Sequence, residues 1–582
     1  MLAAEKSEIR DGMRIEWDVP ITTDDGIVLR ADVFRPIDDG RYPVIFSYGP
    51  YAKGLAFQAG YPSAWERLAR DHPDAVADSS NKYMNWEVVD PEKWVPDGYA
   101  CVRVDSRGAG RSPGFIDTRS PRETQDIYQC IEWAAAQTWC SGKVGMCGIS
   151  YYAINQWSAA ERQPPHLAAC CAWEGSSDPY REQARHGGIL CEFRVNWYDM
   201  QVKTVQHGLG ERGPRSPITG ELVCGPETLS DAELAKNRVD VRDQFYEHPL
   251  RDAFWIERSS DLSKVALPLL SCGNWGGQGL HGRGNVEGFL QAGSRQKWLE
   301  MHGLEHWTEF YTAYGVDLQK RFFARFLKGD EASWPDEPRV HLRVRRLDGF
   351  VTRGENEWPL ARTRWTRFYL NPADRSLQAG PASATIAYDG LGDGVTFLSE
   401  PLAEETEITG PSVVKLLLES STQDADVFAV LRAFAPGGDE VVFQGAIDPH
   451  TPIGQGWLRA SHRKLDPARS TPYRPWHSHD EQQPLRPGEI VELDVEIWPT
   501  CVVLPPGYRI GLTIRGKDYE YSAASGGRLS NFKNELRGCG PFLHNDPRDR
   551  PAEIFGGRVT LHTDPKRSSY LLLPIIPSNS SS

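Results

Sequence analysis

Ser150 is the residue of this 582-residue sequence whose surroundings best suit nucleophilic chemistry. It follows an apolar run at residues 144–147 and the dipeptide Gly148-Ile149, and helix-forming residues begin directly after it. A serine on a sharp strand-to-helix turn is exposed to substrate, and the next backbone N–H, that of Tyr151, points toward a developing oxyanion. A serine that only caps the helix is the alternative. The context favours a nucleophile that attacks an acyl carbon.

A histidine that follows a later strand would serve as general base for this serine. His306 follows the strand-like segment KWLEMH and a glycine. In proteins that carry a nucleophilic serine on a strand-to-helix turn of this kind, the general base comes late in the catalytic part of the chain. His302 falls in or at the end of the strand, where a hydrogen-bonded core histidine is the commoner case, and His281 in a glycine-rich turn is a second competitor. We predict His306 as the base.

The elements that must position these residues alternate between strand-like and helix-like patterns. Residues 122–137 carry apolar side chains at helical spacing. Strand-like runs stand at residues 26–36, 42–51, 99–105, 144–147, 166–173 and 265–275. Strands separated by helices predict an α/β fold with a parallel sheet.

Two stretches interrupt this alternation of strands and helices, and the second half of the chain does not show it. Residues 54–97 are rich in Trp, Asp and Pro and read as an insertion over one face of the sheet. We predict an α/β core over residues 1–175 and 265–334, with a helical cap over residues 176–264. From residue 335 to 582, short alternating or apolar strands punctuated by Gly, Pro and Asp predict an all-β jelly-roll sandwich.

Charge and cysteine usage exclude several classes of partner. The net charge is −14 without long acidic runs, which disfavours nucleic acids and anionic membranes. Residues 1–18 do not have the pattern of a signal peptide, and no segment is long and apolar enough for a membrane span.

The 11 cysteines lack CxxC or zinc-site spacing, which predicts reduced, buried thiols in a cytoplasmic protein with no metal. The sequence leaves open whether the chain forms a homo-oligomer.

Several ordered motifs carry a family resemblance. The segments YGPYAKG, VRVDSRGAGRSPG and GISYYA in the first half, and EITGPSVVKLLLESS and LPPGYRIGLTI in the second, resemble the cocaine esterase, X-prolyl dipeptidyl-peptidase and α-amino-acid ester hydrolase superfamily, of CocE/NonD type. The resemblance covers nearly the whole chain. It implies an α/β-hydrolase core with a cap and a jelly roll, and a serine hydrolase that cleaves an ester or amide through an acyl-enzyme on Ser150 without a metal or organic cofactor. It also implies that the Tyr51 hydroxyl binds the oxyanion and that His306 is the base.

The acid of the triad is where the chain departs from this family. The family usually places an aspartate after the strand read here as LPLLSCGNW, and this chain has glycine at that position. Glu174 ends the neighbouring strand-like run HLAACCAWEG, a costly place for a carboxylate without a partner. We predict that Glu174 orients His306, with Asn274 and Asp178 as the alternatives and an inactive site as a further explanation.

The substrate is open between two groups. An X-prolyl dipeptidyl-peptidase or an α-amino-acid ester hydrolase needs carboxylates for a free amino group, and three cap acids are candidates: Glu182, Glu192 and Asp199. An esterase would use an aromatic pocket, for which the candidates are Trp157, Trp197, Tyr198 and Trp275. We predict Trp157 and Trp275 as substrate contacts. A ligand-binding protein with an impaired triad is the rival from another class.

Overall fold

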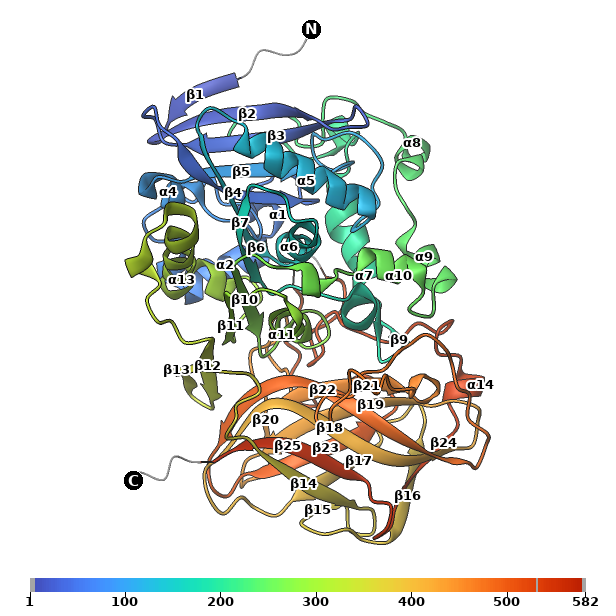
Figure 1. Ribbon diagram of the computed structural model, residues 1–582. Coiled ribbons are helices and arrows are strands. Elements are labelled where there is room, and N and C mark those ends of the chain that lie inside the picture. Colours follow the sequence, from blue (N-terminus) through green and yellow to red (C-terminus); the bar gives the residue numbers. More distant parts are fainter. Residues whose placement is uncertain (1–5, 530–531, 578–582) are drawn as a thin grey trace.

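The computed structural model describes residues 6–529 and 532–577, which form an α/β part stacked on an all-β part (Figure 1). Within these residues the α/β part holds an eleven-stranded sheet. Its strands, in spatial order, are β1 (Lys6–Arg10), β2 (Met13–Thr22), β3 (Val28–Arg35), β5 (Ala100–Asp105), β4 (Tyr42–Gly49), β6 (Cys140–Ile149), β7 (Leu167–Trp173), β10 (Leu269–Asn274), β11 (Lys297–His302), β12 (Val340–Arg346) and β13 (Gly349–Glu355).

The strands from β5 to β12 pair in parallel, which confirms the predicted parallel α/β arrangement. Helices α5 (Pro121–Ala135) and α6 (Tyr151–Glu161) pack on one face, and α13 (Ala313–Phe323) packs on the other. Helix α11 (Gly282–Gln291) follows β10 and contacts it. Because helices cover both faces, the central strands are largely buried and mostly apolar.

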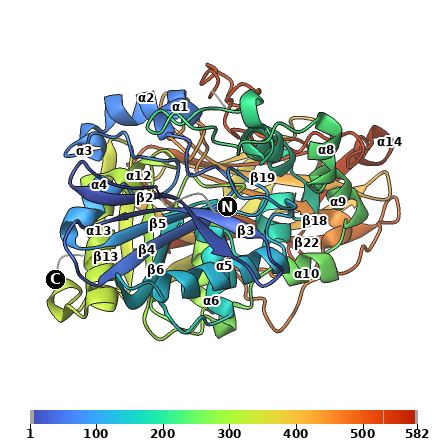
Figure 2. The same ribbon diagram turned by 90° about the horizontal axis from the view of Figure 1, so that it is seen from above.

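The connections place two helical layers near the carboxyl ends of these strands. Between β4 and β5 lie α1 (Phe57–Gly60), α2 (Pro62–Asp71), α3 (Pro73–Val76) and α4 (Pro91–Trp94). Between β7 and β10 lie α7 (Phe193–Trp197), α8 (Asp231–Lys236), α9 (Val241–Glu247) and α10 (Ala253–Arg258), with the short strands β8 (Arg185–His186) and β9 (Ile189–Leu190). Seen from above, α1 and α2 lie on the opposite side of the sheet from α5 and α6 (Figure 2).

Two strands beyond residue 335 extend the first sheet. Strand β12 pairs in parallel with β11, and β13 pairs antiparallel with β12. The all-β part begins at β14 (Arg364–Asn371). The alternation in VHLRVRR identifies a strand but not its sheet, whereas a strand that follows the crossover helix α13 adds to the parallel sheet.

The all-β character of the second part is confirmed, but its strands close into a ring instead of forming two separate sheets. The ring runs through β14, β15 (Ser376–Gln378), β17 (Val395–Ser399), β23 (Arg509–Arg515), β19 (Asp426–Phe434), β21 (Gly454–Arg459), β22 (Ile490–Leu504), β18 (Thr406–Ser420) and β25 (Tyr570–Ile576). Strand β25 pairs with both β14 and β18, which completes it. Strands β24 (Arg558–Thr563) and β16 (Ala384–Asp389) branch from β18. Closure removes exposed strand edges.

Candidate active site

Ser150 lies on a strained turn between β6 and α6. Its φ of 55° and ψ of −113° lie outside the regions that non-glycine residues ordinarily adopt. A Cβ on Gly148 would lie 2.4 Å from Cβ of Tyr152 and 3.0 Å from the carbonyl oxygen of Glu87, so the turn requires glycine there. Tyr152 replaces the final glycine of the usual GxSxG pattern, and its ring fits because Gly49 has no Cβ to obstruct it.

Glu174 and His306 meet at the carboxyl ends of β7 and β11. His306 Nδ1 lies 2.7 Å from Oε2 of Glu174, and both residues are buried. The Asn274 amide donates to the other oxygen of Glu174 at 3.0 Å and to the carbonyl of Leu304 at 2.9 Å. Asn274 therefore holds the carboxylate rather than the histidine.

The other candidates for acid and base have different surroundings. Asp178 is bonded to Arg181 and Arg251. His302 is a buried, fully bonded histidine, with Nδ1 2.7 Å from Glu300 and Nε2 3.2 Å from Glu174.

Glu87 occupies a position that the sequence did not suggest. Its Oε1 lies 2.7 Å from Nε2 of His306, the nitrogen that would take the serine proton. The backbone N–H of Ile149 donates to the Glu87 carbonyl at 2.9 Å, which fixes Glu87 beside the turn. One sequence feature could have indicated it: an acid stands between apolar residues in NWEVV, within the segment predicted to be an insertion.

The two carboxylates set the charge of the imidazole. Burial opposes a charged His306, but Glu174 and then Glu87 outweigh it and raise its pKa to about 10. Burial raises the pKa of Glu87 to about 7, against the opposing effect of His306. Burial also disfavours charge on Glu174, yet His306 and His302 hold its pKa well below the usual range. At neutral pH His306 is therefore an imidazolium between two acids.

Tyr51, which lines the same cavity as Ser150, and Tyr151, the next residue along the chain, each carry a hydrogen-bond donor. The Tyr51 hydroxyl accepts from Nε1 of Trp197 at 2.9 Å, which leaves its own proton available to the cavity. Burial and the charge of Glu87 raise the pKa of Tyr51 well above its ordinary value, so it stays a donor. Tyr151 is the first residue of α6, where a backbone N–H has no acceptor within the helix. The Tyr151 side chain points elsewhere, since its hydroxyl donates to Glu123 at 2.5 Å.

Ser150, His306, Glu87 and Tyr51 line one cavity. Most of its wall is apolar and comes from three separate parts of the chain. The segment between β4 and β5 supplies Tyr61 and Trp86, the segment between β7 and β10 supplies Phe193 and Trp197, and the all-β part supplies Ala446, Ile447, Leu529, Phe532 and Phe542. The second part of the chain thus helps to enclose the serine.

The predicted substrate contacts Trp157 and Trp275 lie elsewhere. Trp157 is fully buried in the core between the sheet and helices α5 and α6. Trp275 is fully buried beside Trp358. Neither lines the cavity, because the strands and helix that carry them turn these side chains into the cores. Trp197 lines it instead.

The three cap acids considered for an amino group each have a cationic partner. Glu182 bonds to Arg283 at 2.8 Å, Glu192 to Arg242 at 3.0 Å and Asp199 to Lys203 at 2.6 Å. None of the three lines the cavity.

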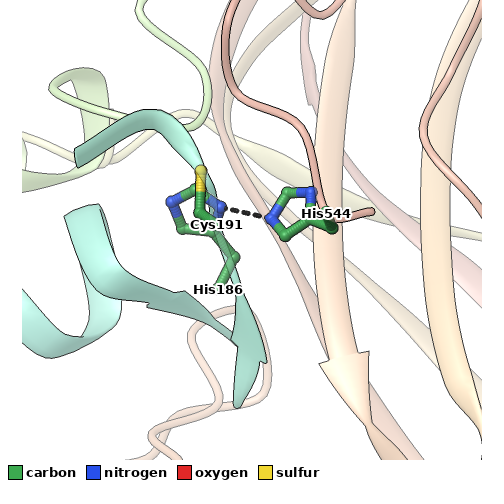
Figure 3. A group of neighbouring side chains, drawn as sticks. All are labelled: His186, Cys191 and His544. Carbon is green, nitrogen blue, oxygen red and sulfur yellow. Dashed lines mark hydrogen bonds between the residues drawn. The ribbon is translucent and has the colours of Figure 1, made fainter. Parts of the chain in front are cut away.

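One group of metal-ligand side chains occurs in the described ranges: His186, Cys191 and His544, with ligand atoms within 4.8 Å of one another (Figure 3). His186 Nδ1 and His544 Nε2 are 2.7 Å apart. The outer nitrogens contact the Glu182 carbonyl at 3.1 Å and the Asp518 carboxylate at 2.7 Å. One shared proton completes this chain, so hydrogen bonds account for the group, which joins the segment after β7 to the all-β part.

The chain matches two protein-family models and several known proteins. Residues 25–308 match the model of the X-Pro dipeptidyl-peptidase (S15) family, and residues 332–572 match that of the X-Pro dipeptidyl-peptidase C-terminal non-catalytic domain. Cocaine esterase from Rhodococcus sp. (strain MB1 Bresler) is 25% identical over 96% of this chain and 98% of its own length.

Solved structures are similar over almost the whole chain. A CocE/NonD family hydrolase from Staphylococcus aureus has 32% identity and a TM-score of 0.82, covering 97% of this chain and 94% of that one. An α-amino acid ester hydrolase has 17% identity and a TM-score of 0.67 over 99% of both chains, a likeness of fold.

Fold, cavity and matches together define a serine hydrolase. The chain belongs to the X-Pro dipeptidyl-peptidase (S15) family, as its motifs predicted.

Glu87→Gln tests the effect of the second carboxylate. The change removes a negative charge 2.7 Å from His306, so the pKa of His306 falls, by about 1 unit or more. If His306 is the general base, activity rises with pH as His306 loses its proton, so we expect the acid limb of kcat/KM against pH to move to lower pH in the variant. The matched control is Glu92→Gln, in the same segment and bonded to Ser79 and Ser80. An unmoved limb would contradict the assignment.

Trp157→Phe tests the placement of that tryptophan. The variant leaves a small cavity in the core and lowers the free energy of unfolding by about 1–3 kcal/mol. KM for an ester substrate stays near the wild-type value. Trp197→Phe, which removes the donor to Tyr51, is the comparison and changes kcat or KM instead. Denaturant melts and steady-state kinetics on both variants separate the two cases.

Proposed function

We propose that the protein hydrolyses carboxylic esters of small molecules through an acyl-enzyme on Ser150. The observation that carries this proposal is that the strained Ser150 lines one cavity with His306. The Nδ1 atom of His306 is hydrogen-bonded to Glu174. The fold assignment that goes with it is an α/β-hydrolase core with a cap over residues 176–264 and a C-terminal jelly roll.

The proposed mechanism gives each residue one task. Substrate enters and separates Glu87 from His306. The Nε2 proton leaves on the Glu87 carboxylate, whose pKa burial raises to about 7, and Nε2 is then free as a base. Nε2 takes the Ser150 proton while Oγ attacks the acyl carbon, and Glu174 stabilises the imidazolium. Tyr51 and the Tyr151 N–H hold the oxyanion. His306 then protonates the leaving alcohol, and water releases the acid by the same steps.

The surroundings of the serine favour an ester without a free α-amino group. The cap acids that might bind an ammonium group are already paired with Arg or Lys. The cavity wall is mostly aromatic and apolar. Relatives include a cocaine esterase.

A second candidate is an aminoacyl hydrolase, of the X-prolyl dipeptidyl-peptidase or α-amino-acid ester hydrolase type. Glu87 favours it, because it is an acid within the cavity and its Oε2 has no hydrogen-bond partner among the described residues. In that reaction Glu87 would leave His306 and bind the ammonium group of the substrate. Alanyl-proline p-nitroanilide and phenylglycine methyl ester separate this candidate from the first.

The location of the enzyme is also proposed. All eleven cysteines are buried and unpaired, as is typical of a reducing cytoplasm. No helix among the described residues has the length and apolar character to cross a bilayer.

Ser150→Ala and Glu174→Gln test the catalytic assignment on p-nitrophenyl acetate and butyrate. We expect kcat to fall about 10⁴-fold or more without the nucleophile, and about 10²- to 10⁴-fold without the charge of Glu174. Glu192→Gln, which alters a paired cap acid remote from the serine, keeps activity. Circular dichroism shows that each variant is folded. Full activity of Glu174→Gln would remove that residue from the site, and a wild type inert to esters and to a fluorophosphonate probe would refute the esterase.

Tyr51→Phe tests the oxyanion donor. Removing one donor from a buried oxyanion site lowers kcat about 10²- to 10³-fold. KM changes little, because the phenyl ring keeps its packing against Trp197. A change confined to KM would assign Tyr51 to substrate binding.

A further inference from the structure

A second cavity adjoins the first at Ser150. Residues common to both walls include Tyr51, Ser150, Trp197 and His281. The new part of its wall holds two arginines, Arg119 and Arg194, together with Tyr151, Ile154 and Gln183. One side of the serine is thus aromatic and contains Glu87, and the other side is cationic.

The two guanidinium groups are buried without an acid. Arg119 and Arg194 are each 6% exposed, and neither forms an ion pair in residues 6–529 or 532–577. Arg119 donates only weakly, to the Arg258 carbonyl at 3.4 Å, and Arg194 donates to the Thr118 hydroxyl at 3.1 Å. Nη1 of each is buried and has no hydrogen-bond partner in the same ranges.

Other buried arginines of the segment after β7 do have acids. Arg185 bonds to Asp549 at 2.7 Å, and Arg258 bonds to Asp117 at 2.9 Å. Glu123, an acid of the same region, is engaged by the Tyr151 hydroxyl at 2.5 Å and the Arg119 backbone N–H at 2.6 Å, not by a guanidinium.

Burying these two arginines without an acidic partner is energetically costly. Burial lowers the pKa of Arg119 to about 10, and the positive charge of Arg194 adds to that effect. Burial likewise lowers the pKa of Arg194 to about 10. Both stay charged at neutral pH, so two like charges share an enclosed site. Such a site is stabilised when an anion enters it.

We propose that the substrate carries a carboxylate, which Arg119 and Arg194 bind while Ser150 attacks the ester carbon. The serine lines both cavities, so the carboxylate and the ester belong to one small molecule and are separated by a few bonds. Glu87 on the aromatic side repels an anion, which fixes the orientation of the substrate. His281 supports a polar ligand here, because it is 1% exposed and neither of its ring nitrogens has a partner among the described side chains and backbone.

The inference rests on the proposed esterase activity, and two pairs of substrates test it. For a carboxylate on the acyl side, p-nitrophenyl hydrogen glutarate is compared with p-nitrophenyl methyl glutarate. For a carboxylate on the leaving-group side, 4-carboxyphenyl butyrate is compared with 4-(methoxycarbonyl)phenyl butyrate. We expect the wild type to prefer the anionic member of one pair, and that pair identifies which side faces the arginines.

Arg119→Gln and Arg194→Gln then remove the preference. Each loses about 10- to 100-fold in kcat/KM on the preferred anionic ester, mainly through KM, as expected for a charge-assisted hydrogen bond. Turnover of the neutral partner stays within about threefold of wild type and shows that the variants fold. The Lys variants retain part of the preference. Arg242→Gln is the matched control, because this arginine of the same segment is paired with Glu192 away from the cavity.

Two outcomes would overturn the proposal. One is a wild type that hydrolyses the neutral and anionic esters of both pairs equally. The other is an equal loss on neutral and anionic esters in the variants, which would assign the arginines to the oxyanion or to packing. In both cases the wild type still hydrolyses the neutral esters and is labelled at Ser150 by the fluorophosphonate, so the esterase assignment survives. Loss of both by the wild type would instead refute the esterase itself.

Discussion

The buried carboxylate of Glu174 is the interaction on which the site depends. It accepts hydrogen bonds from His306, His302 and Asn274 at 2.7, 3.2 and 3.0 Å. An unpaired carboxylate at the end of a central strand would be costly, and three donors from β10, β11 and the loop after β11 converge on it. This arrangement connects three neighbouring strands through one side chain. It also explains the Asn at the end of β10: an amide there donates to the carboxylate, whereas an aspartate would repel it.

A second acid, Glu87, also contacts the imidazole of His306 and affects its pKa. Glu87 holds Nε2 of His306 as Glu174 holds Nδ1, and the two keep the ring protonated in the free enzyme. A substrate that separates Glu87 from the ring changes the local electrostatics in the direction that catalysis needs. The free and occupied cavities thus differ in the basicity of His306, and the difference arises from one contact.

The cavity also shows why the all-β part is joined to the sheet. Residues such as Phe532 and Ile447 form part of the wall opposite the serine, and His306 itself donates its backbone N–H to the carbonyl of Ala446 at 2.8 Å. Enclosure by three separate segments excludes water and strengthens every charge within. Arg119 and Arg194 line the adjoining cavity, and we propose that their lack of an acid affects substrate choice.

Local pattern alone determined the nucleophile turn and the parallel sheet, because a glycine before the serine, an apolar strand and a following helix act within a few residues. The cost of an acid after an apolar run pointed to Glu174 from the sequence. Only the tertiary structure decided that Glu87 contacts His306, since 219 residues separate them and no spacing encodes that meeting. It also placed Trp157 in the core and β12 in the first sheet, because periodicity identifies a buried face or a strand but not the partner against which it packs.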